Sequence, residues 1–155
     1  MRRIKSILFI FSIAALTSAI LYACGGSASD SEKSANVTGD VKLQQYKNQG
    51  RKLYIQYCAN CHQVTGAGLG LVYPPLNKSD YMDSNLEKVI CLMKNGISGE
   101  ITVNGKVYNQ AMPGISTLTN LEIAEIATYI YNTWEHDKGL IKVTDVEKII
   151  NQCEQ

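Results

Sequence analysis

The sequence predicts an all-α domain with one small β-hairpin inserted between its helices. Apolar residues recur at spacings of three and four in several segments, which is the period of an amphipathic helix. Ser/Thr-x-x-Glu patterns, which open helices as capping boxes, occur at 84–87, 119–122 and 144–147. One Asn-Gly pair, at 104–105, lies between alternating residues, as is typical of a hairpin turn. A length of 155 residues favours one domain.

Composition excludes some classes of partner. Hydrophobic residues make up 45% of the chain and charged residues 19%, a balance that supports a packed core. The formal net charge is +1, and removal of the three cations in the first five residues would leave the rest slightly acidic. Such a chain offers no basic surface, so we expect no nucleic-acid partner.

The first 23 residues are predicted to be a signal peptide. Three cations precede an apolar stretch, 7–20, that is short for a membrane span. Leu21-Tyr22-Ala23-Cys24 resembles the bacterial lipobox, in which Cys24 becomes the lipidated first residue of the mature protein. The alternatives are a plain secreted protein with a free Cys24 and an uncleaved anchor. A lipidated Cys24 would place the protein in the bacterial cell envelope, anchored to a membrane and facing the periplasm.

Residues 24–40 are predicted to be the lipidated cysteine and a flexible tether, and residues 41–155 the folded domain. The tether is small and polar and cannot pack a core. A chain of this kind spans about 20–24 Å on average.

A helix is predicted from Val41 to Cys58, because Leu43, Leu53 and Tyr54 belong to an apolar series with helical spacing. Gly50 interrupts this series at a cost of about 1 kcal/mol relative to alanine. A glycine in such a position predicts close approach by another helix.

The motif Cys58-Ala59-Asn60-Cys61-His62 follows this helix. Two thiols three positions apart with an adjacent histidine form the attachment pattern of c-type haem. The thiols add to the vinyl groups of the haem, and the imidazole becomes the proximal iron ligand. A zinc half-site would need a second ligand pair, and the chain has no second CxxC or HxxxH. A thioredoxin-like redox pair would need a strand before the motif, whereas the preceding pattern is helical.

A glycine-rich segment, 65–76, comes next and is predicted to wrap the proximal side of the haem. Its spacing is neither that of a GxGxxG loop nor that of a P-loop. We expect the carbonyl of Pro75 to accept a hydrogen bond from His62 Nδ1, as partners of ligating histidines commonly do.

Four further elements are predicted in order. The first is a helix that opens with the capping box at 84–87 and ends at Gly96. A hairpin at 101–108 follows. The last two are a helix over 119–134 and a short helix over 144–153.

Met112 lies in an Ala-Met-Pro-Gly loop and belongs to no helical stripe. Pro113 biases it toward an extended backbone, which can direct the side chain inward. Met112 is therefore predicted to be the distal iron ligand, with a mere pocket-filling role as the alternative. Met82 and Met93 are predicted to pack in the core.

Three other polar or reactive residues remain. Cys91 and Cys153 are either a disulfide, as is usual for paired thiols in an oxidising compartment, or two buried thiols that never meet. His136 lies in a polar Glu-His-Asp-Lys run and is predicted to face solvent.

From about Tyr46 to Trp134 the sequence resembles the class I mono-haem cytochromes c. The resemblance is carried by the helix with Gly50 and Tyr54 before CxxCH, the Pro-Pro-Leu after it, the Asn-Gly hairpin before Ala-Met-Pro-Gly, and an aromatic last long helix. It implies the cytochrome c fold, in which N- and C-terminal helices pack over a covalent haem c.

The resemblance also implies a set of residue roles. His62 and Met112 would be the axial ligands, and Tyr73 and Leu76 would line the pocket. Gly50 and Tyr54 would pack against the last long helix near Tyr129. Cys91 and Cys153 lie outside the usual family motifs.

Function follows from the expected ligands. An iron held by histidine and a thioether has no free site, which favours an electron carrier over an enzyme. Its partners would be a redox donor and a redox acceptor, as for the cytochrome subunits of periplasmic oxidoreductases that the segment before Met112 resembles. A haem enzyme with peroxidase or gas-binding activity would need an open site and an acid/base group. A purely structural subunit would not need a covalent haem.

Overall fold

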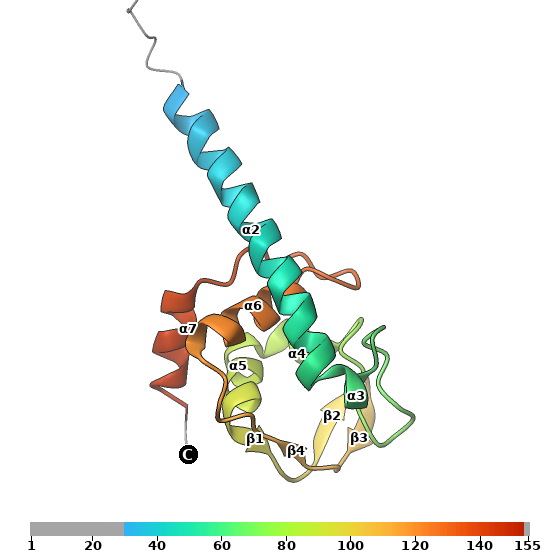
Figure 1. Cartoon of the computed structure of the whole chain (residues 1–155). Helices are drawn as coiled ribbons and strands as arrows, with labels where there is room; N and C mark the ends of the chain where they lie inside the picture. Colours follow the sequence, from blue (N-terminus) through green and yellow to red (C-terminus); the bar gives the residue numbers. More distant parts are fainter. Residues whose placement is uncertain (1–29, 154–155) are drawn as a thin grey trace, which may run out of the picture. The chain divides into compact units, whose positions relative to one another are not determined.

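The protein is described here from a computed structural model, in which residues 30–153 are placed (Figure 1). The signal segment, Cys24 and the first part of the predicted tether lie outside the described residues. The compact unit that begins at Thr38 holds the elements discussed below. Among the described helices, none combines the length and the apolarity needed to cross a membrane.

Helix α2, Asp30–Tyr57, begins earlier than predicted. Residues 30–40, predicted as part of a flexible tether, are helical in the structure. The segment contains no proline, and Glu32, Lys33 and Ala35 are favourable helix residues, so nothing local stops the helix at Val41. Composition alone reported the polarity of this segment and not its conformation.

A single helical turn, α3, Ala59–His62, carries the CxxCH motif directly after α2. The Cys58 N–H donates to the Tyr54 carbonyl at 2.8 Å, and the His62 N–H donates to the Cys58 carbonyl at 3.0 Å. Gln63, with φ of 63°, ends the turn. The motif is therefore an extension of the N-terminal helix.

Helices α4, Asp80–Ser84, and α5, Leu86–Asn95, follow the proximal loop. The sequence analysis did not predict α4, and its capping box at 84–87 was wrong. Asn85 is the N-cap of α5, and its side chain donates to the Tyr81 carbonyl of α4 instead. The predicted end of α5 is confirmed, because Gly96 has φ of 78° and its N–H donates to the Leu92 carbonyl.

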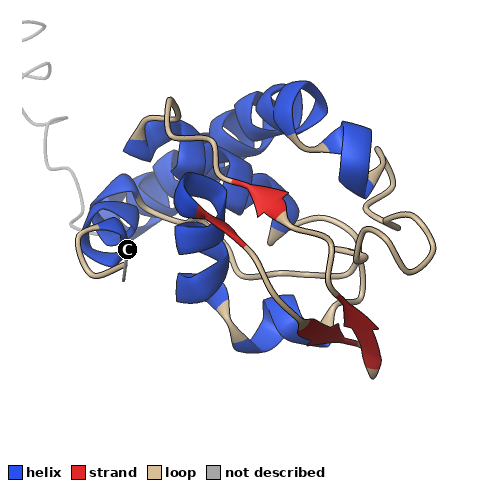
Figure 2. Cartoon of the chain, turned by 90° about the horizontal axis from the view of Figure 1, so that it is seen from below, coloured by secondary structure: helices blue, strands red, loops and turns tan. Residues whose placement is uncertain are grey.

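Two small sheets accompany the helices, so the all-α prediction is only partly right (Figure 2). Strands β2, Ile101–Val103, and β3, Lys106–Tyr108, form the predicted hairpin. Asn104 and Gly105 have φ of 51° and 72°, the left-handed pair that a tight hairpin turn requires. Strands β1, Gly96–Ile97, and β4, Met112–Pro113, pair in a second sheet that was not predicted.

Helix α6, Asn120–Ile130, has the predicted capping box between Thr119 and Glu122. It ends before Trp134, which was expected on the helix but has φ of 53° in the segment after it. Helix α7, Val143–Ile150, starts at the N-cap Lys142 without a side-chain cap, so the predicted box at 144–147 was also wrong.

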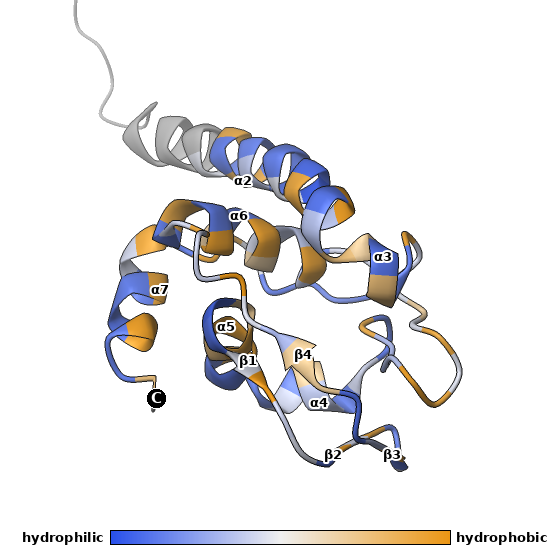
Figure 3. Ribbon diagram, turned by 60° about the horizontal axis from the view of Figure 1, so that its bottom comes forward, coloured by the Kyte–Doolittle hydropathy of each residue, from blue (hydrophilic) through white to orange (hydrophobic). Residues whose placement is uncertain are grey.

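The core lies between α2, α5, α6 and α7, and Figure 3 shows α2 running alongside α6. A Cβ built on Gly50 would meet the Glu125 backbone and lie 2.9 Å from Tyr129 Cβ. The Tyr54 ring centroid is 5.4 Å from those of Tyr129 and Trp134. The close approach predicted at Gly50 is confirmed.

Helix α7 packs on α5 and α6 through the fully buried Val146. Cys91 of α5 and Cys153, after α7, form a disulfide with Cα atoms 5.7 Å apart, a separation usual for disulfides. The C-terminal helix is thus covalently tied to the core.

Candidate haem site

One cavity brings together Cys58, Cys61 and His62 from the end of the N-terminal helix and Met112 from β4. These residues are far apart in sequence and meet because α2 crosses α6 while β4 pairs beside α5. The other predicted pocket residues, Tyr73, Pro75 and Leu76, also line this cavity.

His62 is held in the form that a metal ligand needs. Its side chain is buried, and Nδ1 lies 3.0 Å from the carbonyl of Pro74. The expected partner, Pro75, was wrong by one residue. Burial lowers the pKa of His62, against the raising effect of the Pro74 hydrogen bond. A neutral imidazole that donates from Nδ1 leaves the Nε2 lone pair available to iron.

The glycine-rich segment sets the position of that carbonyl. Gly66 accepts through its carbonyl from the N–H of Leu76 at 2.7 Å and of Asn77 at 3.0 Å. Gly66 has φ of 68°, and a Cβ there would lie 2.8 Å from the Trp134 ring. Only glycine fits both conditions, so the loop folds back on itself and brings Pro74 to His62.

Cys58 and Cys61 are unpaired thiols, and both are half-buried. Burial, and secondarily the neighbouring Cys61, raises the pKa of Cys58 to about 12. Redox-active CxxC pairs have lowered thiol pKa values and usually follow a strand, whereas this motif follows a helix. Both observations disfavour a thioredoxin-like pair. Beside them, a hydrogen bond to Cys61 raises the pKa of the Tyr73 phenol.

Met112 is positioned by the short sheet that sequence analysis missed. In the register of β1 and β4, Ile97 lies opposite Met112 and Gly96 lies opposite Pro113. A Cβ on Gly96 would stand only 2.5 Å from Gly114 N. The two glycines therefore let the Met112 segment lie directly against the end of α5.

Lys94, at the end of α5, holds the chain beyond Met112. Its Nζ donates to the carbonyls of Ser116 at 2.7 Å and Leu118 at 2.6 Å. Sequence analysis did not single out Lys94, because a lysine in the last turn of a helix is common on favourable helix-dipole grounds alone.

Met82 and Met93 also line the cavity, but both belong to the buried core, with 1% and 5% of their surface exposed. They come from helices α4 and α5, as their predicted packing role requires. Met112 is half-buried and stands outside that core cluster. Of the three thioethers, Met112 is the one that core packing does not occupy.

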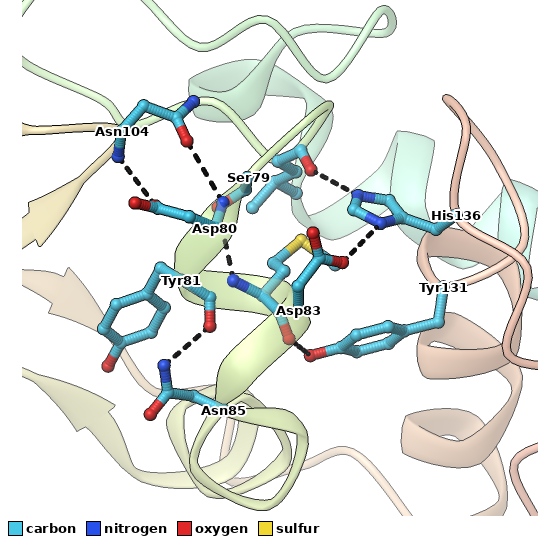
Figure 4. A network of polar contacts seen from close by, with 10 residues as sticks. Ser79, Asp80, Tyr81, Asp83, Asn85, Asn104, Tyr131 and His136 are labelled. Carbon is cyan, nitrogen blue, oxygen red and sulfur yellow. Dashed lines mark hydrogen bonds and ion pairs between the residues drawn. The ribbon is translucent and has the colours of Figure 1, made fainter.

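The hairpin supplies another wall through the buried Val103 and Tyr108. It is clamped to α4 by two reciprocal bonds (Figure 4). The Asp80 N–H donates to Asn104 Oδ1 at 3.1 Å, and the Asn104 N–H donates to Asp80 Oδ1 at 2.7 Å. The turn that sequence analysis identified thus also fixes one side of the pocket.

One polar atom in the cavity has a bearing on the cofactor. The Tyr81 hydroxyl is buried and has no hydrogen-bond partner among the described residues. A buried unpaired hydroxyl costs about 1–3 kcal/mol. Haem is a flat apolar macrocycle with carboxylate groups at its edge, so a largely apolar cavity with one unpaired donor fits it.

The structure corrects the prediction for His136. Its side chain is only 5% exposed, with Nδ1 3.0 Å from Asp83 Oδ1 and Nε2 3.0 Å from the Leu76 carbonyl (Figure 4). Trp134 and Glu135 before it have φ of 53° and 80°. These left-handed residues turn His136 inward, which the polarity of the local sequence did not indicate.

Comparison with known proteins agrees with this geometry. Residues 47–130 match the family described as cytochrome C oxidase, cbb3-type, subunit III. Cytochrome c-552 of Thermus thermophilus is 34% identical over 89 residues, which cover 55% of this chain and 67% of that protein. Cytochrome c-552 of a second strain of the same species is also 34% identical over 89 residues, or 60% of that protein.

A more distant relative is the cytochrome c subunit of alcohol dehydrogenase (quinone) from Gluconobacter oxydans. It is 26% identical over 108 residues, which cover 66% of this chain and 22% of that protein. The family match spans more than half of the chain and includes the CxxCH motif. The chain therefore belongs to the cytochrome c family as a class I mono-haem member, and its cofactor is a covalently attached haem c.

Proposed function

We propose that the protein is a single-electron carrier whose haem iron is held by His62 and Met112. The observation that supports this most directly is the one cavity that collects both residues with Cys58 and Cys61. Two protein ligands leave no coordination position for a substrate, so electrons would pass without bond formation.

Each residue has a distinct task in this proposal. Cys58 and Cys61 attach the macrocycle, and His62 presents Nε2 because Pro74 fixes its Nδ1. Met112 presents a soft thioether, which favours reduced iron and raises the potential. When bound, the haem supplies the one-electron couple. The apolar walls keep water away and lower the reorganisation that accompanies a change of charge.

The composition of the cavity wall supports a carrier over a peroxidase. Among the described residues that line it there is no Asp, Glu, Lys or Arg, and His62 is the sole histidine. Peroxidase chemistry needs an acid/base group beside an open iron site. His62 does not qualify, because the proposal assigns it to the iron.

We further propose that the carrier is tethered to a bacterial membrane through a lipidated Cys24 and faces the periplasm, as the signal and lipobox patterns indicate. Its donor and acceptor would be redox proteins. The printed names of its relatives, an oxidase subunit and a dehydrogenase subunit, support a place between a dehydrogenase and a respiratory acceptor.

The ligand assignment is tested with haem-loaded wild type and Met112→Ala, with Met93→Leu as the matched control. Wild type and the control should show the methionine–ferric charge-transfer band and a reversible one-electron couple. Met112→Ala should lose the band, fall in potential and bind small ligands. A band that persists in Met112→Ala, or rapid peroxide turnover by the wild type, would contradict the proposal.

The anchor is tested separately by mass spectrometry of the mature N-terminus and by fractionation. We expect an acylated Cys24 in the membrane fraction, and release of the Cys24→Ser protein into the soluble fraction. A mature N-terminus at another residue without acyl mass would refute the anchor and leave the electron-carrier proposal standing.

A further inference from the structure

His136 lies between two hydrogen-bond acceptors. Its Nε2 is 3.0 Å from the Leu76 carbonyl and its Nδ1 is 3.0 Å from a carboxylate oxygen of Asp83. A neutral imidazole donates from one nitrogen and would turn a lone pair toward the other acceptor. The imidazolium donates from both nitrogens. The geometry therefore matches the protonated ring.

The bond to Leu76 connects His136 to the proximal side of the haem cavity. Leu76 lines the cavity, and it follows by two residues the Pro74 whose carbonyl fixes His62. The segment 74–76 thus accepts a hydrogen bond from a histidine at each end. One of these histidines is the expected iron ligand, and the other comes from the chain after α6.

The bond to Asp83 connects the same ring to α4. That helix is in turn attached to α6, because Tyr131 Oη donates to the Met82 carbonyl at 2.9 Å (Figure 4). The Tyr131 ring lies against the imidazole, with ring centroids 6.2 Å apart. His136 therefore joins the proximal loop, α4 and the segment after α6 at a single buried point.

The charged groups around His136 are mostly carboxylates. Besides Asp83, the adjoining cleft is lined by the carboxylates Asp80, Glu135 and Asp137 and the ammonium groups Lys78 and Lys138. Lys78 is paired with Glu135 at 3.1 Å on the exposed surface, and Lys138 lies over the Tyr131 ring. Asp83 is thus the direct counterion of the His136 ring.

On the basis of the proposed electron-carrier function, we infer that His136 is a positioning residue that couples a proton to the redox state of the haem iron. As the protein accepts one electron from its donor, the added negative charge favours the imidazolium. When His136 loses its proton to water, one of its two bonds and one positive charge are lost. The reduction potential therefore falls as pH rises through this deprotonation, and by reciprocity the reduced protein holds the proton more tightly.

The protonation state is tested directly by nitrogen NMR of histidine-labelled, haem-loaded protein. At neutral pH we expect both His136 nitrogens to carry protons in the reduced protein. A spectrum of the neutral ring, with one protonated nitrogen, would overturn the inference. This measurement does not depend on electron transfer or on any variant.

The coupling is tested by redox titration against pH in wild type, His136→Asn and Asp83→Asn, with Glu135→Gln as the control. The control removes an adjacent exposed charge and leaves the His136 bonds in place. In wild type the reduction equilibrium constant should fall by up to about tenfold per pH unit through the deprotonation. His136→Asn should lose this fall, Asp83→Asn should shift it to lower pH, and Glu135→Gln should keep it.

Two results would overturn the coupling: an undiminished fall in His136→Asn, or an equal loss in Glu135→Gln, which would indicate a general surface-charge effect. Failure of the proposed function looks different, because wild type would then show no reversible couple at any pH. In that case the coupling fails with it, and the nitrogen spectra still decide the protonation of His136.

Discussion

The crossing of α2 and α6 can be tested with one methyl group. A Cβ on Gly50 would meet the Glu125 carbonyl oxygen, lie 2.5 Å from the Glu125 carbonyl carbon and lie 2.9 Å from Tyr129 Cβ. Two of these atoms are backbone and cannot move unless α6 itself shifts. Gly50→Ala is therefore expected to force the two helices apart.

The expected magnitude combines two opposing effects. Adding a methyl group to a well-packed interior costs about 1–3 kcal/mol, and a backbone clash belongs at the upper end of this range. Alanine is more favourable than glycine inside a helix by about 1 kcal/mol. We therefore expect Gly50→Ala to lower the free energy of unfolding by about 2 kcal/mol.

Gly39 provides the matched control, because it lies in the same helix and a Cβ there would meet nothing within 4 Å. Gly39→Ala should raise the free energy of unfolding by up to about 1 kcal/mol. Guanidinium unfolding of the haem-loaded proteins, followed by far-UV circular dichroism, should show midpoint shifts of opposite sign. The Gly50→Ala shift should be about 0.5–1 M. Equal shifts, or a Gly50→Ala protein as stable as wild type, would refute the close-packed crossing.

Three further predictions follow from the structure. Tyr81→Phe should lower the unfolding free energy of the haem-loaded protein by about 1–3 kcal/mol but not that of the apoprotein, since only the cofactor offers its hydroxyl a partner; parallel denaturation curves of both forms check this. Replacing Cys91 and Cys153 together by serine should cost up to about 4 kcal/mol in thermal or denaturant unfolding, given their separation of 62 residues; a wild type with alkylatable thiols at both positions would contradict it. Hydrogen bonds from the Thr119 N–H and hydroxyl lower the pKa of Glu122, so its contribution is present above the unfolded value near 4.5 and is lost as pH falls through the folded value. Glu122→Gln should flatten this acid limb of a stability–pH curve, and an unchanged limb would show that other carboxylates cause it.

Features encoded by adjacent residues were predictable from the sequence. The hairpin follows from Asn104 and Gly105, which alone in that stretch tolerate two consecutive left-handed conformations. The capping box of Thr119 and Glu122 needs only two side chains one helical turn apart. Gly96 ends α5 for a similarly local reason.

The same local rule was wrong where another contact was available. The capping box expected at 84–87 fails because Ser84 belongs to α4, and Asn85 bonds to Tyr81 instead. His136 is buried because two left-handed residues and the distant acceptors Leu76 and Asp83 draw it inward. Such partners lie 53 to 60 positions away, and no periodicity in the sequence reports them.

The geometry of the candidate iron site depends on contacts of this second kind. The segment carrying His62 is placed by the crossing at Gly50 and by the folded loop at Gly66, whose missing Cβ atoms admit Glu125 and Trp134. The segment carrying Met112 is placed at the other end of the core by Gly96. The CxxCH and Ala-Met-Pro-Gly motifs therefore specify which atoms the iron would meet. The separation between those atoms is set by helix packing, because no contact within either motif refers to the other.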